Sequence, residues 1–323
     1  MGEFELIRRH FQRAPSAPGG GAVVLGIGDD CALLQPSPGH QLAISSDMLV
    51  EGRHFFADVD PEALGHKALA VNLSDLAAMG ARPLGFTLAL ALPHADSDWL
   101  TRFAKGLFAL ADAHACPLVG GDTTRGPLNL CITVFGEVRP GRALRRDAAR
   151  EGDDLYVSGR TGEARLALEQ LRGTDWAGPA IHAELRARLE RPTPRNPLGV
   201  ALAAVAGVRA AIDLSDGLAG DLGHILQASG VGAEIDLPAL PVAPALRGLP
   251  DAQRLDCLLA GGDDYELLFT AAPDAREAIA EASAASGTSV TRVGRITAAP
   301  GLRLLDAAGQ AVPFGSSSFD HFA

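Results

Sequence analysis

The chain has 323 residues and a formal net charge of −11, with 47% hydrophobic and 21% charged residues. This length suits about two domains at roughly 150 residues each, and the composition is that of an ordinary globular protein. The acidic balance argues against a nucleic-acid partner, because nucleic-acid-binding domains usually carry basic patches. The longest apolar run, near residues 84–92, is far shorter than the roughly 20 residues that a membrane-spanning helix needs, so we expect no membrane insertion.

The cysteines are scattered singly along the chain, at Cys31, Cys116, Cys131 and Cys257. None forms a C-x-x-C pair, which argues against a zinc site or thioredoxin-like chemistry. Single cysteines suit a reducing compartment, and the acidic N-terminus lacks the apolar stretch of a signal peptide. We therefore expect a cytoplasmic protein.

Apolar periodicity and turn residues predict an alternation of strands and helices. A short amphipathic helix over 3–13 precedes a Pro/Gly-rich linker at 14–21. Strands are predicted at 42–46, 84–92, 128–138, 155–158, 209–214, 233–237, 265–270, 290–296 and 302–305. Helices are predicted at 61–79, 97–114, 162–172, 180–190, 197–205, 217–228 and 274–285.

The helix predicted over 61–79 has clear boundary signals. Asp60 can cap its start, Pro61 suits its first turn, and Gly80 can end it. Its body is nearly all apolar or small, so the helix should be buried. Asp75 would then need a cation or several hydrogen-bond donors, because an unpaired buried carboxylate is costly.

A second informative helix follows the segment Ile212-Asp213-Leu214-Ser215-Asp216-Gly217. Its apolar residues recur at helical spacing on one face. We expect Asp213 to end a strand, and Ser215 or Asp216 to cap the helix. Carboxylates and free backbone N–H groups would then meet at one place, and such N–H groups can also hold phosphate.

A hinge is predicted over 139–153, where Pro140-Gly141 breaks a strand and Glu151-Gly152-Asp153 forms a turn. It divides the chain into a domain over 1–140 and a domain over 150–323. Each mixes strands and helices without the regular alternation of a doubly wound parallel sheet. The expected fold class is therefore α+β, in two domains.

Aspartates recur beside glycines and hydroxyl residues in six places. They are Gly28-Asp29-Asp30, Ser45-Ser46-Asp47, Asn72-Leu73-Ser74-Asp75, Gly120-Gly121-Asp122, Asp213-Leu214-Ser215-Asp216 and Gly261-Gly262-Asp263-Asp264. Most follow apolar runs, which places them at the ends of strands. Taken alone, most read as turns about as well as ligand sites. Together they favour hard divalent cations such as Mg²⁺, which take oxygen ligands and often share them with substrate phosphates.

Other phosphate-handling and hydrolytic classes lack support. There is no P-loop, no protein-kinase signature set, and no assignable Ser-His-Asp arrangement. Arginines cluster near the predicted hinge, at Arg142, Arg145 and Arg146, where they could contact phosphate or form a solvated basic turn. The aromatic tail at Phe319 could act as a structural plug or close over an aromatic ligand.

Most of the chain resembles the thiamine-monophosphate kinase family, within the aminoimidazole-ribonucleotide synthetase superfamily. The matching stretches run in order from end to end: GIGDDCALL (26–34), SSDMLVEGRHF (45–55), HKALAVNLSDLAAMGARP (66–83), VGGDTTRGPL (119–128), IDLSDGLAGDLGHI (212–225), GGDDYELLFT (261–270) and FDHFA (319–323). The resemblance implies ATP-dependent phosphorylation of thiamine phosphate to thiamine diphosphate. It also implies N-terminal domains that bind ATP and Mg²⁺ and pair in a homodimer, and C-terminal domains that close an active-site cleft.

The resemblance also implies roles for individual residues. Several Mg²⁺ ions would be held by Asp30, Ser45, Ser46, Asp47, Asp75, Asp122, Asp213 and Asp216. ATP would be contacted by Gly121, Asp122, Arg146 and Ser215. Thiamine phosphate would be contacted by His54, Asp263 and Phe319. No general base is implied.

Two positions differ from the pattern of that family. Ser46 stands where Thr is usual, and Asp263 stands where the longer Glu is frequent. Alternatives are another ATP-dependent enzyme of the superfamily, such as selenophosphate synthetase or the hydrogenase maturation protein, or a non-catalytic nucleotide or metal sensor. The first alternative would require a reactive N-terminal or C-terminal cysteine. The chain instead has Cys31 inside an acidic motif and ends His321-Phe322-Ala323.

Overall fold

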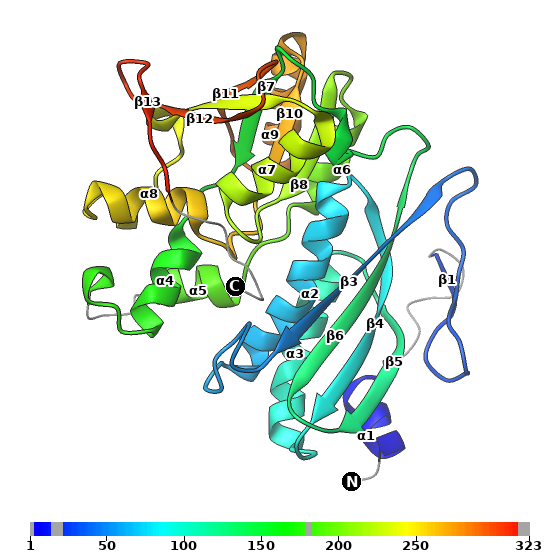
Figure 1. The fold of residues 1–323 in the computed structure, drawn as a ribbon. Helices are drawn as coiled ribbons and strands as arrows, with labels where there is room; N and C mark the ends of the chain where they lie inside the picture. The colour runs from blue at the N-terminus through cyan, green and yellow to red at the C-terminus, as the bar shows by residue number, and fades with distance from the viewer. Residues whose placement is uncertain (1–2, 14–21, 179–182, 316–323) are drawn as a thin grey trace. The chain divides into compact units, whose positions relative to one another are not determined.

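A computed structural model describes residues 3–13, 22–178 and 183–315 (Figure 1). The chain forms two compact units. The N-terminal unit runs to Leu76 and resumes over Ala81–Gly141, and the C-terminal unit takes Ala77–Gly80 and the chain from Arg142 onward. The linker predicted at 14–21 and the tail residue Phe319 lie outside the described residues.

The N-terminal unit combines three helices with a four-stranded mixed sheet among the described residues. Its elements are α1 (Glu3–His10), β1 (Val23–Leu25), β2 (Leu33–Leu34), β3 (Gln41–Val50), α2 (Pro61–Ala78), β4 (Arg82–Leu92), α3 (Ser97–Ala113), β5 (Leu118–Arg125) and β6 (Asn129–Val138). The sheet has the order β3-β6-β4-β5, with β4 and β5 parallel and the other neighbours antiparallel. β1 and β2 form a separate two-stranded hairpin.

Helix α2 forms as its boundary residues predict. The Asp60 carboxylate accepts the Ala63 N–H at 3.1 Å, and Gly80 has a φ of +67° after the last turn. α2 and α3 lie side by side (Figure 1) and touch backbone to backbone: a Cβ on Gly106 would come within 1.8 Å of the Glu62 carbonyl oxygen. Close packing of this kind requires glycine, and it fixes the helix that carries Asp75.

The C-terminal unit is built on a seven-stranded mixed sheet of order β13-β12-β9-β11-β7-β10-β8. Its strands are β7 (Asp154–Ser158), β8 (Val208–Asp213), β9 (Gly232–Asp236), β10 (Leu267–Ala271), β11 (Val290–Thr297), β12 (Gly301–Leu305) and β13 (Ala311–Val312). Its helices are α4 (Glu163–Leu171), α5 (Ala183–Glu190), α6 (Asn196–Ala204), α7 (Leu218–Ser229), α8 (Asp251–Ala260) and α9 (Arg276–Ser286). β9 and β12 pair in parallel, and the other neighbours are antiparallel.

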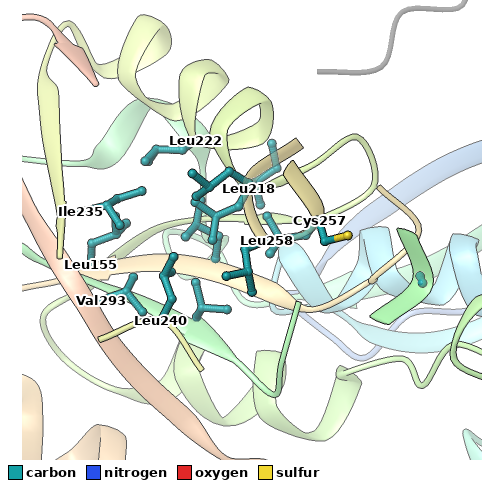
Figure 2. Packing of buried hydrophobic residues seen from close by; sticks show 14 of the residues in the cluster. Leu155, Leu218, Leu222, Ile235, Leu240, Cys257, Leu258 and Val293 are labelled. Carbon is teal, nitrogen blue, oxygen red and sulfur yellow. The ribbon is translucent and has the colours of Figure 1, made fainter. Parts of the chain in front are cut away.

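Alternation along the strands gives this sheet a core on each face. On one face, Leu155 packs in a cluster with Leu218 and Leu222 of α7 and Leu258 of α8 (Figure 2). On the other, its neighbour Tyr156 joins the cluster formed with α6 and α9. The mixed sheets and helices of the two units confirm the predicted α+β class.

Three sequence predictions about local structure are wrong. β3 continues to Val50 and β5 to Arg125, so the motifs 45–47 and 120–122 lie within strands rather than at strand ends. Pairing decides this: β3 matches β6 residue by residue over its whole length. α8 was not predicted, and α7 begins after Gly217 without a cap from Ser215 or Asp216.

None of the described helices is long and apolar enough to span a membrane.

Candidate active site

In the N-terminal unit, the face of β3 toward α2 brings together predicted metal ligands. The Ser45 hydroxyl donates to Asp75 at 2.5 Å, and the Asp47 N–H donates to the Asn72 side-chain oxygen at 3.0 Å. Asn72 is held in turn by its own donation to the Ala68 carbonyl at 3.0 Å. Asn72 and Asp75 are three residues apart on α2 and therefore share a face. The sequence predicted a buried Asp75 that needs a cation or several donors; in the structure Asp75 is half-buried and accepts the Ser45 hydroxyl.

Ser46 lies on the other face of β3. Its hydroxyl contacts the Thr133 hydroxyl at 3.0 Å and donates to the Ile132 carbonyl at 3.1 Å. Because side chains alternate along a strand, the structure does not bring the Ser46 side chain to Ser45 and Asp75. The motif Ser45-Ser46-Asp47 is therefore split between the two faces of the sheet.

His54 follows β3 in a loop that its own ring stabilises. The His54 Nδ1 accepts the Val50 N–H at 2.9 Å, which places the proton of the neutral ring on Nε2. The His54 carbonyl accepts a hydrogen bond from the buried Lys67 at 3.5 Å. The ring is half-buried and fixed in orientation, as a ligand contact would require.

Gly121 and Asp122 lie in the middle of β5. Gly121 has a φ of +148°, and a Cβ there would come within 1.9 Å of the Leu88 carbonyl oxygen. Only glycine fits this approach between β4 and β5. Asp122 is exposed opposite Ala89, and Asp30 is exposed before β2, where its N–H donates to Asp29 at 3.0 Å.

In the C-terminal unit, two acidic motifs are joined by backbone hydrogen bonds. Asp213 is buried at the end of β8, as predicted. Past it, the Asp263 N–H donates to the Ser215 carbonyl and the Tyr265 N–H donates to the Leu214 carbonyl, each at 2.9 Å. These hydrogen bonds hold segments 213–217 and 261–266 side by side, with Asp216 and Asp263 half-buried and Asp213 and Asp264 buried.

The 261–266 segment adopts a strained backbone. Asp263 has a φ of +64° and Tyr265 a φ of +49°, both in the left-handed region that ordinary residues avoid. A Cβ on Gly262 would come within 2.2 Å of the Ser215 carbonyl oxygen, so glycine is required beside this contact. Such strain is typical of segments whose conformation serves a site.

A buried carboxylate within or just after each of these segments accepts hydrogen bonds from backbone N–H groups. Asp264 accepts the Gly162 N–H at 2.8 Å, at the start of α4. Asp221 accepts the N–H groups of Asp216 and Gly217, both at 3.1 Å. Burial raises the pKa of Asp264 well above its usual range and raises the pKa of Asp221 to about 7.

A buried ion-pair network holds Glu266, the last residue of the 261–266 segment. Glu266 is fully buried and accepts from Arg195 at 2.5 and 2.7 Å and from Ser158 at 2.6 Å. Burial alone would raise the pKa of Glu266, but Arg195 and Ser158 hold it below its ordinary value. The carboxylate therefore stays ionised and fixes the strand that follows the acidic motif.

Arg146 lies in the short 3-10 helix Arg146–Ala148 beside α7. Its carbonyl accepts the Ser229 hydroxyl at 2.8 Å, and its side chain is exposed. Its neighbour Arg145 is instead paired with Asp147 at 2.6 Å. The structure thus leaves the Arg146 side chain exposed and pairs that of Arg145 with Asp147.

The predicted metal ligands have the chemistry that Mg²⁺ prefers, but the structure places them in small groups. The predicted metal-binding side chains are all carboxylates or hydroxyls, the oxygen ligands that Mg²⁺ takes. Among the described residues, no group of three or more His, Cys, Asp or Glu side chains lies close enough together to hold a metal ion. Ser45 and Asp75 are one pair in direct contact.

Sequence reasoning missed Asp221 and Asn72 as residues that organise the site. Asp221 lies four residues after Gly217 in the first turn of α7. An acidic side chain there can reach back to the N–H groups before the helix, as in a capping box. That spacing was the available signal, whereas Asn72 was named in the motif Asn72-Leu73-Ser74-Asp75 but was given no role.

Two domain families match the chain. The AIR synthase related protein N-terminal domain matches residues 28–138, and the corresponding C-terminal domain matches residues 150–307. The fold and these matches define the class as a two-domain AIR synthase-related protein. The hydrogenase maturation protein HypE in complex with ATP shares this fold at 22% identity, with a TM-score of 0.77 over 97% of this chain and 95% of that one.

More similar proteins narrow the class. The thiamine-monophosphate kinase of Salmonella typhimurium is 47% identical over 325 residues, covering 100% of this chain and 98% of the relative. The crystal structure of thiamine-monophosphate kinase from Stenotrophomonas maltophilia is 49% identical, with a TM-score of 0.82 over 90% of this chain and 92% of that one. AaThiL complexed with AMPPCP and TMP is 30% identical, with a TM-score of 0.76 over 89% of each chain. The chain belongs to the thiamine-monophosphate kinase family.

Proposed function

We propose that this protein transfers the γ-phosphoryl group of ATP to the phosphate of thiamine phosphate, forming thiamine diphosphate and ADP. The main support for this proposal is the end-to-end match to a thiamine-monophosphate kinase, at 47% identity over the whole chain. The complex of AaThiL with AMPPCP and TMP, a protein 30% identical to this one, supports the same pair of substrates.

The chemistry explains the absence of an assigned general base. The nucleophile is a phosphate-monoester oxygen with a second pKa of about 6, so it already carries charge near neutral pH. The oxygen attacks the γ-phosphorus as the bond to the β-phosphate oxygen breaks, and ADP leaves with that oxygen. We propose direct in-line transfer, in which orientation and charge neutralisation supply most of the catalysis.

We propose the following roles for the site residues. Several Mg²⁺ ions would be held by Asp30, Ser45, Asp47, Asp75, Asp122, Asp213 and Asp216, and Ser46, on the opposite face of β3 from Ser45, would serve a different ion. When bound, Mg²⁺ would neutralise the facing phosphates and orient them. Gly121, Asp122, Arg146 and Ser215 would contact ATP, and His54, Asp263 and Phe319 would contact thiamine phosphate.

The chain's own groups support these roles. Gly121 is exposed and carries no side chain, so a phosphate can approach its backbone. The Nε2–H of His54 can donate to a substrate oxygen while its Nδ1 is engaged. The exposed Arg146 guanidinium can bind phosphate oxygens through two N–H groups.

We further propose a homodimer formed through the N-terminal unit. Apolar side chains alternate along the open face of β3, where Leu42, Ile44 and Met48 are 45%, 59% and 51% exposed. An alternating apolar face is typical of a strand that packs on a partner, and contiguous exposed apolar area marks interaction sites. The free cysteines support our proposal of a cytoplasmic location.

The deciding test is turnover by the purified protein with ATP, thiamine phosphate and Mg²⁺, read as thiamine diphosphate by chromatography. Thiamine without its phosphate is the matched control acceptor and should give no product. ATP binding without turnover would refute the kinase and indicate a sensor. With a chiral γ-phosphorus, inversion is expected, and retention would exclude direct transfer.

A further inference from the structure

Asp221 lies outside the proposed ligand set but holds the backbone of a residue within it. Its Oδ2 accepts the N–H of Asp216 and the N–H of Gly217, both at 3.1 Å. The Asp221 N–H in turn donates to the Gly217 carbonyl at 2.9 Å. Residue 221 thus clamps the turn before α7 from both its side chain and its backbone.

The turn held in this way has little conformational freedom. Gly217 has a φ of +116°, and a Cβ there would come within 2.8 Å of the Ala260 backbone. On the opposite side, the Ser215 carbonyl accepts the Asp263 N–H at 2.9 Å. Asp221 supplies the contact that fixes the N–H of Asp216 itself.

A carboxylate is a costly choice for an ordinary helix cap at this position. Asp221 is 2% exposed, and burying an acidic group carries a desolvation penalty. At α3, by contrast, the exposed Asp96 makes an equivalent pair of hydrogen bonds to the N–H groups of Asp98 and Trp99 at 2.9 and 3.1 Å. Asp96 makes similar hydrogen bonds without this burial cost, which indicates that Asp221 serves more than the stability of its helix.

We propose that Asp221 is a positioning residue that fixes the Asp216–Gly217 turn so that the Asp216 side chain can bind Mg²⁺ with ATP. The inference rests on the proposed role of Asp216. Groups that orient metal ligands typically alter metal affinity or activity by about 10- to 100-fold when lost.

The test compares Asp221→Ala, which removes the acceptor, with Asp221→Asn, which keeps an oxygen in nearly the same place. Asp96→Ala is the matched control, because it also removes two backbone hydrogen bonds at a helix start. The readouts are the Mg²⁺ concentration for half-maximal turnover, Mg²⁺-dependent binding of a non-hydrolysable ATP analogue by calorimetry, and the Tm. All assays run well below the Tm of the least stable variant.

We expect Asp221→Ala to raise the half-maximal Mg²⁺ concentration by about 10-fold or more, in both turnover and binding. Asp221→Asn should stay close to wild type, and Asp96→Ala should lower the Tm without moving the Mg²⁺ dependence. If Asp221→Ala does not fold, Asp221→Glu replaces it, because its carboxylate is displaced by one methylene and should perform worse than Asn.

An unchanged Mg²⁺ dependence in Asp221→Ala, or an equal loss in Asp221→Asn, would overturn the inference. Wild-type turnover and Asp216→Asn are measured in parallel. If wild type is active and Asp216→Asn is impaired while Asp221→Ala behaves as wild type, the inference fails and the proposed function stands. If wild type itself has no turnover, the kinase proposal fails, and the calorimetric series still decides the role of Asp221.

Discussion

Aspartates that lie close together in the sequence have different roles in this structure. Asp263 is half-buried at a left-handed position, whereas Asp264 is fully buried against the Gly162 N–H. Asp216 and Asp221 divide in the same way, with Asp221 holding the N–H of Asp216. The acidic motifs therefore combine side chains available to ligands with side chains that hold the backbone in place.

Asp75→Asn tests the proposed metal role most directly. Asn keeps an oxygen that can accept the Ser45 hydroxyl, so the fold should be retained while the negative charge is lost. We expect turnover to fall by about 100-fold, the scale on which losing one electrostatic contact slows catalysis. Steady-state rates with Mg²⁺ and ATP, with circular dichroism for the fold, provide the measurement.

The control for this change is Asp98→Asn, at an exposed acidic residue in the first turn of α3. It should leave turnover unchanged. Near-normal rates in a folded Asp75→Asn variant would exclude Asp75 from the metal site.

Asp263→Asn tests the substrate contact. Asn tolerates the left-handed region as well as Asp does, so the φ of +64° should persist and the Tm should barely change. Loss of a charged hydrogen-bond partner is expected to raise the KM for thiamine phosphate by about 10-fold, with the KM for ATP unaffected. Equal increases in both KM values would show that Asp263 does not discriminate between the substrates.

At the level of elements, charged side chains connect the strands and helices of the C-terminal unit. Asp154 at the start of β7 accepts from Arg276 of α9 at 2.7 and 3.0 Å and from Arg292 of β11 at 2.5 Å. Burial acts to raise the pKa of Asp154, but the two arginines outweigh it and hold the pKa below its ordinary value. This carboxylate therefore stabilises the unit only while it is ionised.

The lowered pKa of Asp154 determines how the stability loss in Arg292→Gln depends on pH. Because the folded pKa of Asp154 lies below its unfolded value, the stabilisation is present above about pH 4 and is lost as the pH falls through the folded pKa. Arg292→Gln should lower stability at neutral pH by no more than about 1 kcal/mol, since its side chain is 42% exposed and screened. The Tm difference from wild type should shrink in acid.

Arg303→Gln is the control, because Arg303 pairs with Glu234 at 3.0 Å and leaves Asp154 untouched. Arg303→Gln should lower the Tm, but the part of the acid-induced loss of stability that depends on Asp154 should stay as in wild type. A Tm difference for Arg292→Gln that grows in acid would contradict the assigned pairing.

The elements also show what local sequence can predict. α2 was predicted with both its ends because Asp60 and Gly80 act within one turn of it. β3 was cut short and β5 was missed, because both strands depend on pairing with β6 and β4, which lie far away in the sequence. The same cause placed Ser46 with Ser45: the strand continues through both, so its pleat separates them.

At the scale of the whole molecule, the sequence predicted two units of mixed strands and helices, and the structure has them. The acidic motifs were identified as a set, but their partners were not. Asn72 lies within one of these motifs and Asp221 shortly after another, but their partners lie across a strand–helix pair or a turn, and the motifs alone do not specify those partners. The site residues named from the sequence stay predictions, whereas the placement of motifs 45–47 and 120–122 at strand ends was wrong.

The open face of β3 leads to a prediction about assembly. Ile44 lies near the middle of β3 and is 59% exposed. Its neighbours Leu42 and Met48 share the face, so a carboxylate at 44 would be buried without a partner if this surface packs on a second copy. Because burying an unpaired charge is costly, Ile44→Glu should convert a dimer to monomers.

The matched control is Val200→Glu, a change of similar chemistry at a 39% exposed position in α6 of the C-terminal unit. Sedimentation velocity over a range of protein concentrations should give a dimer for wild type and Val200→Glu, and a monomer for Ile44→Glu with an unchanged circular dichroism spectrum. A wild-type protein that stays monomeric at all concentrations would refute the homodimer. A dimer that survives Ile44→Glu would instead place its interface elsewhere, because a surface that buries Ile44 cannot accommodate an unpaired carboxylate at low cost.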